Sequence, residues 1–294
     1  GHAPERPYDV TGWTLPLQMG VAAVKVDKSF QTQLERVSSM PVPEGQLLGV
    51  KIDDAPKLPK SRSKTYLVRH ESNASSLAVN RLLREAKPGQ EDYEVLWVAE
   101  EFHSGIGSFP AGTIVVRPAR GRDLRARMDK LARETHIDIL ENEYEIKAPM
   151  WKLRAPRIGL YQPWVANMDE GWTRWLLEKY EFPYTSLHNE DIRAGQLADK
   201  YDVIVFASQS KNGILNGNRG EWVRPEYRGG LGDEGAKAIE NFVRAGGMLV
   251  ALDDASDFAI DTLGLPVRNT LRGVSADKFY CPGAILQIYV DNRN

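Results

Sequence analysis

Apolar positions along this chain change their spacing from one region to the next, and the spacing predicts three regions. Residues 1–60 carry only short apolar stretches, interrupted by Pro41, Pro43, Pro56 and Pro59. Proline removes a backbone donor and clashes with the preceding turn, so no long helix is expected there. We interpret residues 1–60 as a proline-rich connecting segment with a few strands.

Residues 61–155 alternate between apolar runs of strand length and apolar stripes of helical period. The runs and stripes follow one another at 65–68, 75–86, 93–99, 112–116 and 124–135. Strands that alternate with helices favour a parallel or mixed α/β layer. This region is therefore predicted to be a small α/β unit.

After Pro156, strand-like and helical apolar patterns alternate again, and more clearly than in residues 61–155. Strand-like and helical segments follow at 157–161, 169–180, 184–187, 191–197, 201–207, 235–245, 248–252 and 257–263, with a long loop at 211–232. This order predicts an α/β fold with an open, doubly wound and mostly parallel sheet over residues 156–294. Trp172, Trp175 and Leu176 share one face of a predicted helix, so we expect them in the core.

Composition narrows the possible functions. Hydrophobic residues make up 42% of the chain and charged residues 27%, with a formal net charge of −2. These values indicate an ordinary globular protein without the basic surface typical of nucleic-acid binding, and no apolar run is long enough to span a membrane. The single cysteine, Cys281, excludes an internal disulfide framework and is expected to be a buried structural thiol.

The corner after the predicted strand 248–252 is the first candidate for chemistry. In many α/β enzymes such a strand-to-helix corner carries the nucleophile, but here it holds Asp253 and Asp254, followed by Ser256. The carboxylates could bind a cation or act as an acid–base pair, and Ser256 could be a nucleophile. The simpler interpretation is that these residues cap the next helix and complement its dipole.

Two further polar segments follow predicted strands. His70, Glu71 and Asn73 lie between a strand and a helix, where α/β sheets often bind ligands; the alternative is a capping loop. The second segment contains Trp164, Asn167 and Asp169, close to Glu170 in the sequence. Exposed rings beside carboxylates suit a carbohydrate or peptide, and we expect Trp164 to be the exposed tryptophan. The 211–230 loop, with Trp222 and Tyr227, could cover the same strand ends or be disordered.

Residues 203–206, 235–245 and 244–252, the last reading RAGGMLVAL, resemble the class I glutamine amidotransferase-like fold. That family places a cysteine at the corner, served by a downstream histidine and glutamate. Here the corner is Asp253-Asp254-Ala255, and the last histidine of the chain is His188. The resemblance therefore implies the flavodoxin-like fold of the family without its catalysis.

A second resemblance extends over nearly the whole chain. RPYDVTGWTLPLQMG at 6–20, HESNAS at 70–75, PAGTIVV at 110–116, PRIGLYQPWVANMDEGWTRWLLEKYEFPY at 156–184 and FYCPGAILQIYVD at 279–291 are similar to the C-terminal region of bacterial secreted zinc carboxypeptidases. In that subgroup an amidotransferase-like domain follows the peptidase domain. The resemblance implies a secreted or periplasmic protein whose upstream domain, in the same chain, hydrolyses C-terminal peptide bonds with zinc.

The zinc-binding residues of such peptidases have no counterpart in this sequence. They use an H-x-x-E pair with a more distant histidine, and the only such spacing here is His2 to Glu5, where Pro4 prevents a regular helix. We therefore expect no cofactor in this chain, which would serve as a non-catalytic accessory region that supports the upstream domain or helps recognise a peptide or glycan. The alternatives are an independent hydrolase using Asp253, Asp254 or Ser256, and a glycan or small-molecule binding module.

Overall fold

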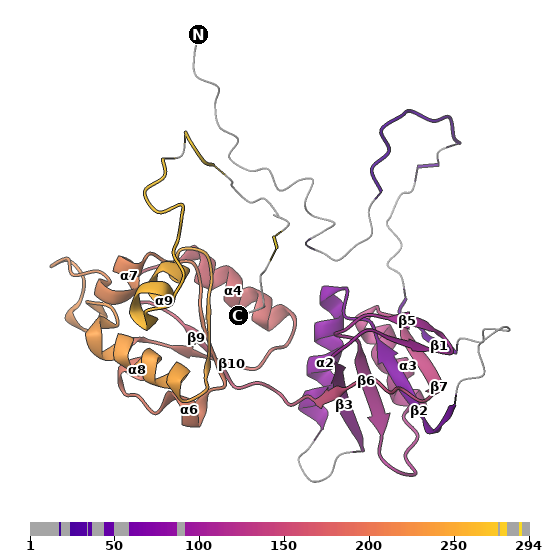
Figure 1. The fold of residues 1–294 in the computed structure, drawn as a ribbon. Coiled ribbons are helices and arrows are strands. Elements are labelled where there is room, and N and C mark those ends of the chain that lie inside the picture. The colour runs from indigo at the N-terminus through magenta and orange to yellow at the C-terminus, as the bar shows by residue number, and fades with distance from the viewer. Residues whose placement is uncertain are drawn as a thin grey trace. The chain divides into compact units, whose positions relative to one another are not determined.

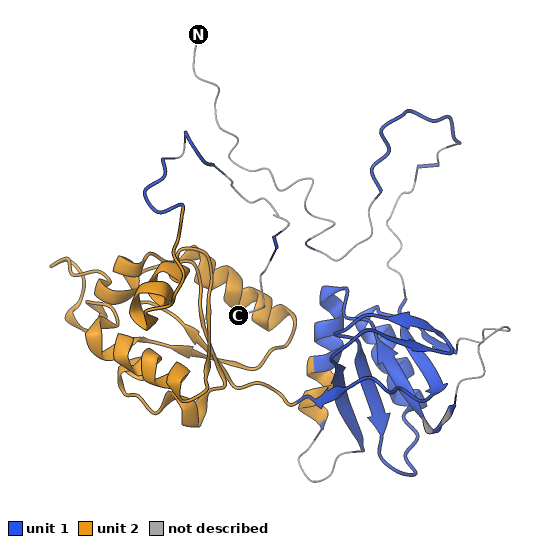
Figure 2. Ribbon diagram, viewed as in Figure 1, with its two compact units in different colours: residues 1–79, 86–153, 271–294 blue, residues 80–85, 154–270 orange. Residues whose placement is uncertain are grey.

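The computed structural model describes residues 18, 24–33, 35–36, 44–49, 59–86, 92–275, 277–280 and 288–289. Cys281 and the H-x-x-E pair lie outside these residues. The chain divides into two compact units, one of residues 1–79, 86–153 and 271–294 and the other of residues 80–85 and 154–270 (Figure 2). Both contain helices and sheets, so the fold is α/β with parallel and antiparallel strand pairs.

The first unit is built on a mixed six-stranded sheet. In sheet order its strands are β1 (Leu47–Gly49), β7 (Ile139–Tyr144), β2 (Lys60–Val68), β6 (Ile114–Pro118), β3 (Tyr93–Val98) and β8 (Met150–Lys152). Only β1 and β7 pair in parallel; the other neighbours are antiparallel. Helix α3 (Arg125–Thr135), a hairpin of β4 (Phe102–Ser104) and β5 (Gly107–Phe109), and residues 73–79 of helix α2 (Asn73–Glu85) complete it.

Apolar side chains on one face of this sheet pack against the hairpin. Leu67, Leu96 and Val115 come from neighbouring strands and share a buried cluster with Phe102 and Phe109. The two phenylalanine rings stack with centroids 5.2 Å apart. The hairpin thus closes the sheet face with aromatic side chains, although its strands were not predicted from the sequence pattern.

The second unit is a parallel sheet connected by helices (Figure 1). Along the chain its elements are β9 (Ile158–Tyr161), α4 (Met168–Lys179), β10 (Tyr184–Leu187), α5 (Asn189–Arg193), α6 (Leu197–Lys200), β11 (Val203–Phe206), α7 (Lys211–Asn216), a 3₁₀ turn at Pro225–Tyr227, α8 (Gly232–Arg244), β12 (Met248–Ala251) and α9 (Ala255–Leu263). The four strands lie in the order β10-β9-β11-β12, and every pair is parallel. Each strand predicted here lies within one or two residues of its observed position.

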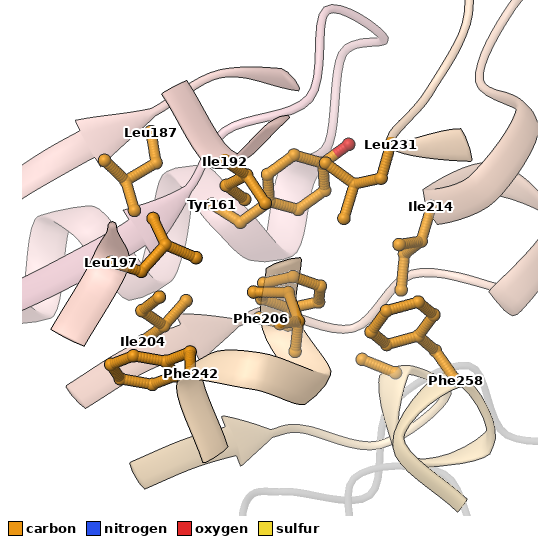
Figure 3. Packing of buried hydrophobic residues seen from close by; sticks show 12 residues of the cluster. Tyr161, Leu187, Ile192, Leu197, Ile204, Phe206, Ile214, Leu231, Phe242 and Phe258 are labelled. Carbon is orange, nitrogen blue, oxygen red and sulfur yellow. The ribbon is translucent and has the colours of Figure 1, made fainter. Parts of the chain in front are cut away.

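The core of this unit lies between one face of the sheet and helices α5 to α9 (Figure 3). Phe206 is at its centre, with its ring 4.8 Å from that of Tyr161 and 5.4 Å from that of Phe258. A Cβ at Gly159 would come within 2.5 Å of a Leu187 methyl group, so the strand needs glycine where neighbouring side chains cross it. Close packing of this kind ties the ends of the strands to one rigid core.

Helix α4 contradicts the orientation expected from its apolar stripe. Trp172 and Trp175 are 60% and 49% exposed, and Leu176 is exposed beside them. The polar Glu170 is instead the buried residue of this helix, with 4% of its surface exposed. The placement of these aromatic residues in the core was therefore wrong, because the helix turns its shorter, polar stripe towards the rest of the unit.

The region expected to be a loop at 211–232 also contains regular structure. Ser210 caps α7 by accepting a hydrogen bond from the Gly213 backbone N–H at 3.1 Å. The 3₁₀ turn follows, and Leu231 lies in the core just before α8. Glycine and asparagine made this segment look irregular, but a side-chain cap and one buried apolar anchor are enough to order a short helix.

A carboxylate fixes the amino ends of β9 and β11. Asp202, just before β11, accepts hydrogen bonds from both terminal nitrogens of Arg154 at 2.6 and 2.8 Å. It also accepts from the Arg157 guanidinium at 2.8 Å and the Arg157 backbone N–H at 2.9 Å. Hydrogen bonds from Arg154 and then Arg157 hold the pKa of Asp202 well below its usual range. Asp202 thus joins the strand that enters the unit to its neighbour in the sheet.

Replacing Asp202 with asparagine should lower the free energy of unfolding by about 2 kcal/mol at pH 7, because two charge-assisted contacts are lost. The folded-state pKa is depressed, so the wild-type contribution is present above the unfolded pKa of about 4 and decreases as pH falls below it. The difference in unfolding free energy between the wild type and Asp202→Asn, measured by urea unfolding, should therefore decrease in acid. Asp199→Asn is the control, because Arg157 contacts the Asp199 carbonyl oxygen and not its carboxylate; an equal loss there would contradict the assignment.

Candidate functional site

The carboxyl ends of four parallel strands bring separate loops of the second unit together. The loops after β9, β10, β11 and β12 all leave from one edge of the sheet. The strand order reverses at β9, because its chain neighbour β10 lies on one side and β11 on the other. Ligands of open α/β sheets bind in the crevice at such a reversal.

Asp253 occupies the apex of the corner after β12 in a left-handed conformation, with φ of 46°. Its carboxylate accepts a hydrogen bond from the Ser208 hydroxyl at 2.8 Å. The Ser256 hydroxyl donates to the Asp253 carbonyl oxygen at 2.6 Å, and among the described residues it bonds to no histidine or lysine. The corner predicted from the sequence is present, and its side chains connect two loops of the unit.

Asp254 and Asp257 lie at the start of α9 without forming a cluster. Asp254 precedes the helix with helical dihedral angles and makes no side-chain cap, because only an extended N-cap residue aims its oxygen at the following N–H groups. The capping interpretation therefore fails for Asp254. Asp257 accepts a hydrogen bond from Asn269 at 3.2 Å. Within the described residues, no group of histidine, cysteine, aspartate or glutamate side chains is arranged to hold a metal ion.

Trp164 forms an aromatic stack at the ends of β9 and β10. Its ring lies 3.7 Å from that of His188 and nearly parallel to it, and Tyr227 contacts it at 4.8 Å. His188 Nδ1 lies 2.7 Å from the Gln162 carbonyl oxygen. A carbonyl oxygen can only accept, so His188 Nδ1 is the donor in this hydrogen bond. Tyr227 thus brings the 211–230 segment to the strand ends, as one interpretation of that segment proposed.

Beside this stack lies a polar pocket of about 380 Å³. Its wall is formed by the loop after β9 and by Asn167, Glu170, Arg174 and His188. Glu170 Oε1 is buried and receives no hydrogen bond, although Arg174 Nε lies 3.4 Å away as an ion pair. Burial raises the pKa of Glu170, and the nearby charges of Arg174 and His188 partly offset this effect. A buried carboxylate in this state can accept a hydrogen bond from a ligand.

Two of the predicted binding residues help to shape this pocket. Asn167 caps α4, accepting from the backbone N–H groups of Asp169 and Glu170 at 2.9 and 3.1 Å, and its amide donates to the Ser208 carbonyl oxygen at 3.0 Å. Asn167 therefore ties the loop after β9 to the loop after β11. Asp169 is exposed and does not line the pocket. Trp164 is 37% exposed, as expected, but Trp172 and Trp175, which we expected in the core, are more exposed.

The other predicted binding residues belong to the first unit. Glu71 forms an ion pair with Arg69 at 3.2 Å, and Asn73 donates to the Gln18 carbonyl oxygen at 3.2 Å. His70 meets the Trp97 ring edge-on at 4.8 Å, and desolvation lowers its pKa. Because β2 runs antiparallel to both of its neighbours, the carboxyl-edge argument that suggested a site at these residues does not apply. Ligand binding by them remains a prediction.

His188 and Arg174 line the pocket, but the sequence analysis selected neither as a site residue. His188 directly follows a predicted strand, which places it at the same sheet edge as Trp164. Arg174 follows Glu170 by one helical turn, a spacing at which the two side chains are neighbours on a helix. The burial of Glu170 depends on the rotation of α4, which the apolar stripe predicted in the opposite sense.

Comparisons with protein-family models, with curated proteins and with solved structures found no match to this chain. No helix in the described part of the chain has the length and apolar character needed to cross a membrane. The geometry of the site itself must therefore support any functional proposal.

Replacing Glu170 with glutamine should raise the stability of the chain at pH 7 by about 1 kcal/mol, because the wild-type carboxylate is buried with no hydrogen bond at Oε1. The folded-state pKa is raised, so the cost of the ionised form is fully present above that pKa and absent below the unfolded pKa. Thermal unfolding of Glu170→Gln and the wild type should therefore differ at pH 7 and converge near pH 4.

The control for this prediction is Glu178→Gln on the same helix. Glu178 is exposed and accepts from the Tyr184 hydroxyl at 2.7 Å, which a glutamine oxygen can also do. This variant should match the wild type at both pH values. Loss of stability in Glu170→Gln at pH 7 would show instead that the Arg174 ion pair outweighs the cost of burial.

Proposed function

We propose that this chain is a non-catalytic accessory region of a zinc carboxypeptidase-like protein, and that its second unit recognises a ligand in the pocket beside Trp164. Hydrolysis by zinc would belong to another domain of the longer protein. The observation that carries the proposal is a polar pocket with a buried carboxylate at the strand-order reversal. The sequence resemblance supplies the peptidase context.

The topology of the second unit supports the amidotransferase-like part of this proposal. Numbered within the unit, its strands lie in the order 2-1-3-4, which matches the first four strands of the flavodoxin-like order. The corner after β12 also has the sharp backbone turn that carries a nucleophile in related enzymes. A similar fold does not imply the same reaction, so the side chains at the corner must show whether catalysis is possible there.

The hydrogen bonds at the corner after β12 favour a structural role over catalysis. A nucleophile needs a base within hydrogen-bond reach, and the Ser256 hydroxyl bonds to a backbone carbonyl instead. The Asp253 carboxylate is held by Ser208, which in turn belongs to the loop that Asn167 contacts. These bonds use the corner to fix the walls of the crevice, which is a structural role.

Ser256→Ala and Asp253→Asn should leave any hydrolytic activity of the purified chain unchanged. Peptide, amide and ester substrates should react at the background rate with the wild type and both variants, because the Ser256 hydroxyl has no base within hydrogen-bond reach among the described residues. The measurement is initial rate against substrate concentration. A fall of about a hundredfold or more in either variant would establish the independent hydrolase instead.

Trp164→Ala in the longer protein should raise KM for peptide hydrolysis several-fold and leave kcat unchanged. Loss of a binding contact that is equal in the ground and transition states produces this pattern. The control is Trp222→Ala in the same unit, whose side chain is 82% exposed and which does not line the pocket. A lower melting temperature without a change in KM would favour structural support of the peptidase domain over recognition.

A further inference from the structure

The pocket beside Trp164 offers several hydrogen-bond donors to one side of a ligand. Arg174 is partly exposed, and its terminal guanidinium nitrogens bond to no described residue. The backbone N–H groups of Trp164, Val165 and Ala166 likewise donate to no described residue, and their loop is exposed. A guanidinium and free N–H groups in one place are the groups that proteins use to bind a carboxylate.

The start of α4 also favours a negatively charged ligand. The loop 162–167 leads into this twelve-residue helix, whose amino end carries partial positive charge. Asn167 satisfies two of the first N–H groups and holds the loop in place, so the pocket is formed before a ligand arrives. An anionic group near Arg174 would therefore meet a prearranged site.

Glu170 makes the pocket unsuitable for a simple anion. Its carboxylate is almost completely buried, lines the same pocket and lacks a hydrogen bond at Oε1. It repels a second negative charge unless the ligand also brings an N–H donor. The distance of 3.4 Å between Glu170 and Arg174 places an acceptor beside a cation. In an α-amino acid, a carboxylate and a nitrogen on one carbon present the complementary pair.

We propose that this pocket binds the α-carboxylate and the adjacent nitrogen of an amino-acid residue, with the carboxylate at Arg174 and the loop N–H groups and the nitrogen at Glu170. The ligand is either the C-terminal residue of a peptide or a free amino acid. This inference rests on the proposed function and specifies which part of a peptide the accessory region recognises. Trp164 and His188 form the wall beside the ligand.

The test uses isothermal titration calorimetry on the complete chain with four probes: N-acetyl-alanyl-alanine, the same dipeptide with a C-terminal amide, free alanine and maltotriose. The acid dipeptide should bind at least tenfold more tightly than its amide. Arg174→Gln should remove this preference. Lys179→Gln, which removes a cation at the end of the same helix and away from the pocket, should keep it.

Glu170→Gln separates the two sources of the ligand. A glutamine oxygen can still accept from a peptide N–H but no longer attracts an ammonium group, so this variant should weaken free alanine about tenfold and the acetylated dipeptide by less. Circular dichroism confirms that each variant is folded.

Equal affinity for the acid and the amide, binding of maltotriose alone, or no binding of any probe would overturn the inference. None of these results decides the accessory role, which the KM measurement on Trp164→Ala tests separately. If that KM rises while the acid and the amide bind equally, the proposed function stands and the ligand assignment fails. If the acid is preferred and KM does not change, the pocket binds amino-acid residues outside peptide hydrolysis.

Discussion

Parallel pairing of β10, β9, β11 and β12 is the constraint on which the second unit depends. Parallel pairing requires each connection to return to the opposite end of the sheet before the next strand begins. The helices of these connections bury the core around Phe206. The same constraint puts four loops at one edge, where a short stretch of chain can assemble groups from distant positions. The pocket wall and the Asp253 corner are both consequences of this arrangement.

The carboxylates at the two ends of this sheet differ in how completely they are paired. At the amino ends, Asp202 is fully paired with two arginines and has no capacity left for a ligand. At the carboxyl ends, Glu170 is buried with an unused acceptor, a state that costs free energy. A fold tolerates such a residue when the remaining core provides enough stability, and this is the usual relation between a site and its scaffold.

Sequence reasoning located the strands of the second unit well, because apolar runs bounded by glycine, proline and polar residues have few alternatives. For the first unit it left a parallel and a mixed sheet open, since strand direction depends on contacts between residues far apart in sequence. The rotation of α4 was predicted in the wrong sense, because hydrophobicity alone placed Trp172 and Trp175 inside. Of the pocket, Trp164 and Asn167 were found as polar or aromatic residues after a strand. His188 required the pairing of β10 with β9, and Arg174 required the rotation of α4.

The left-handed backbone at Asp253 limits how this corner could change over time. Aspartate and asparagine adopt positive φ with little penalty, whereas serine or cysteine at the apex would add strain on the order of 1 kcal/mol or more. A single substitution that introduced a nucleophile there would therefore destabilise the corner, break the link to Ser208 and find no base among the described residues. Selection acting one residue at a time would meet a loss of stability before any gain in activity.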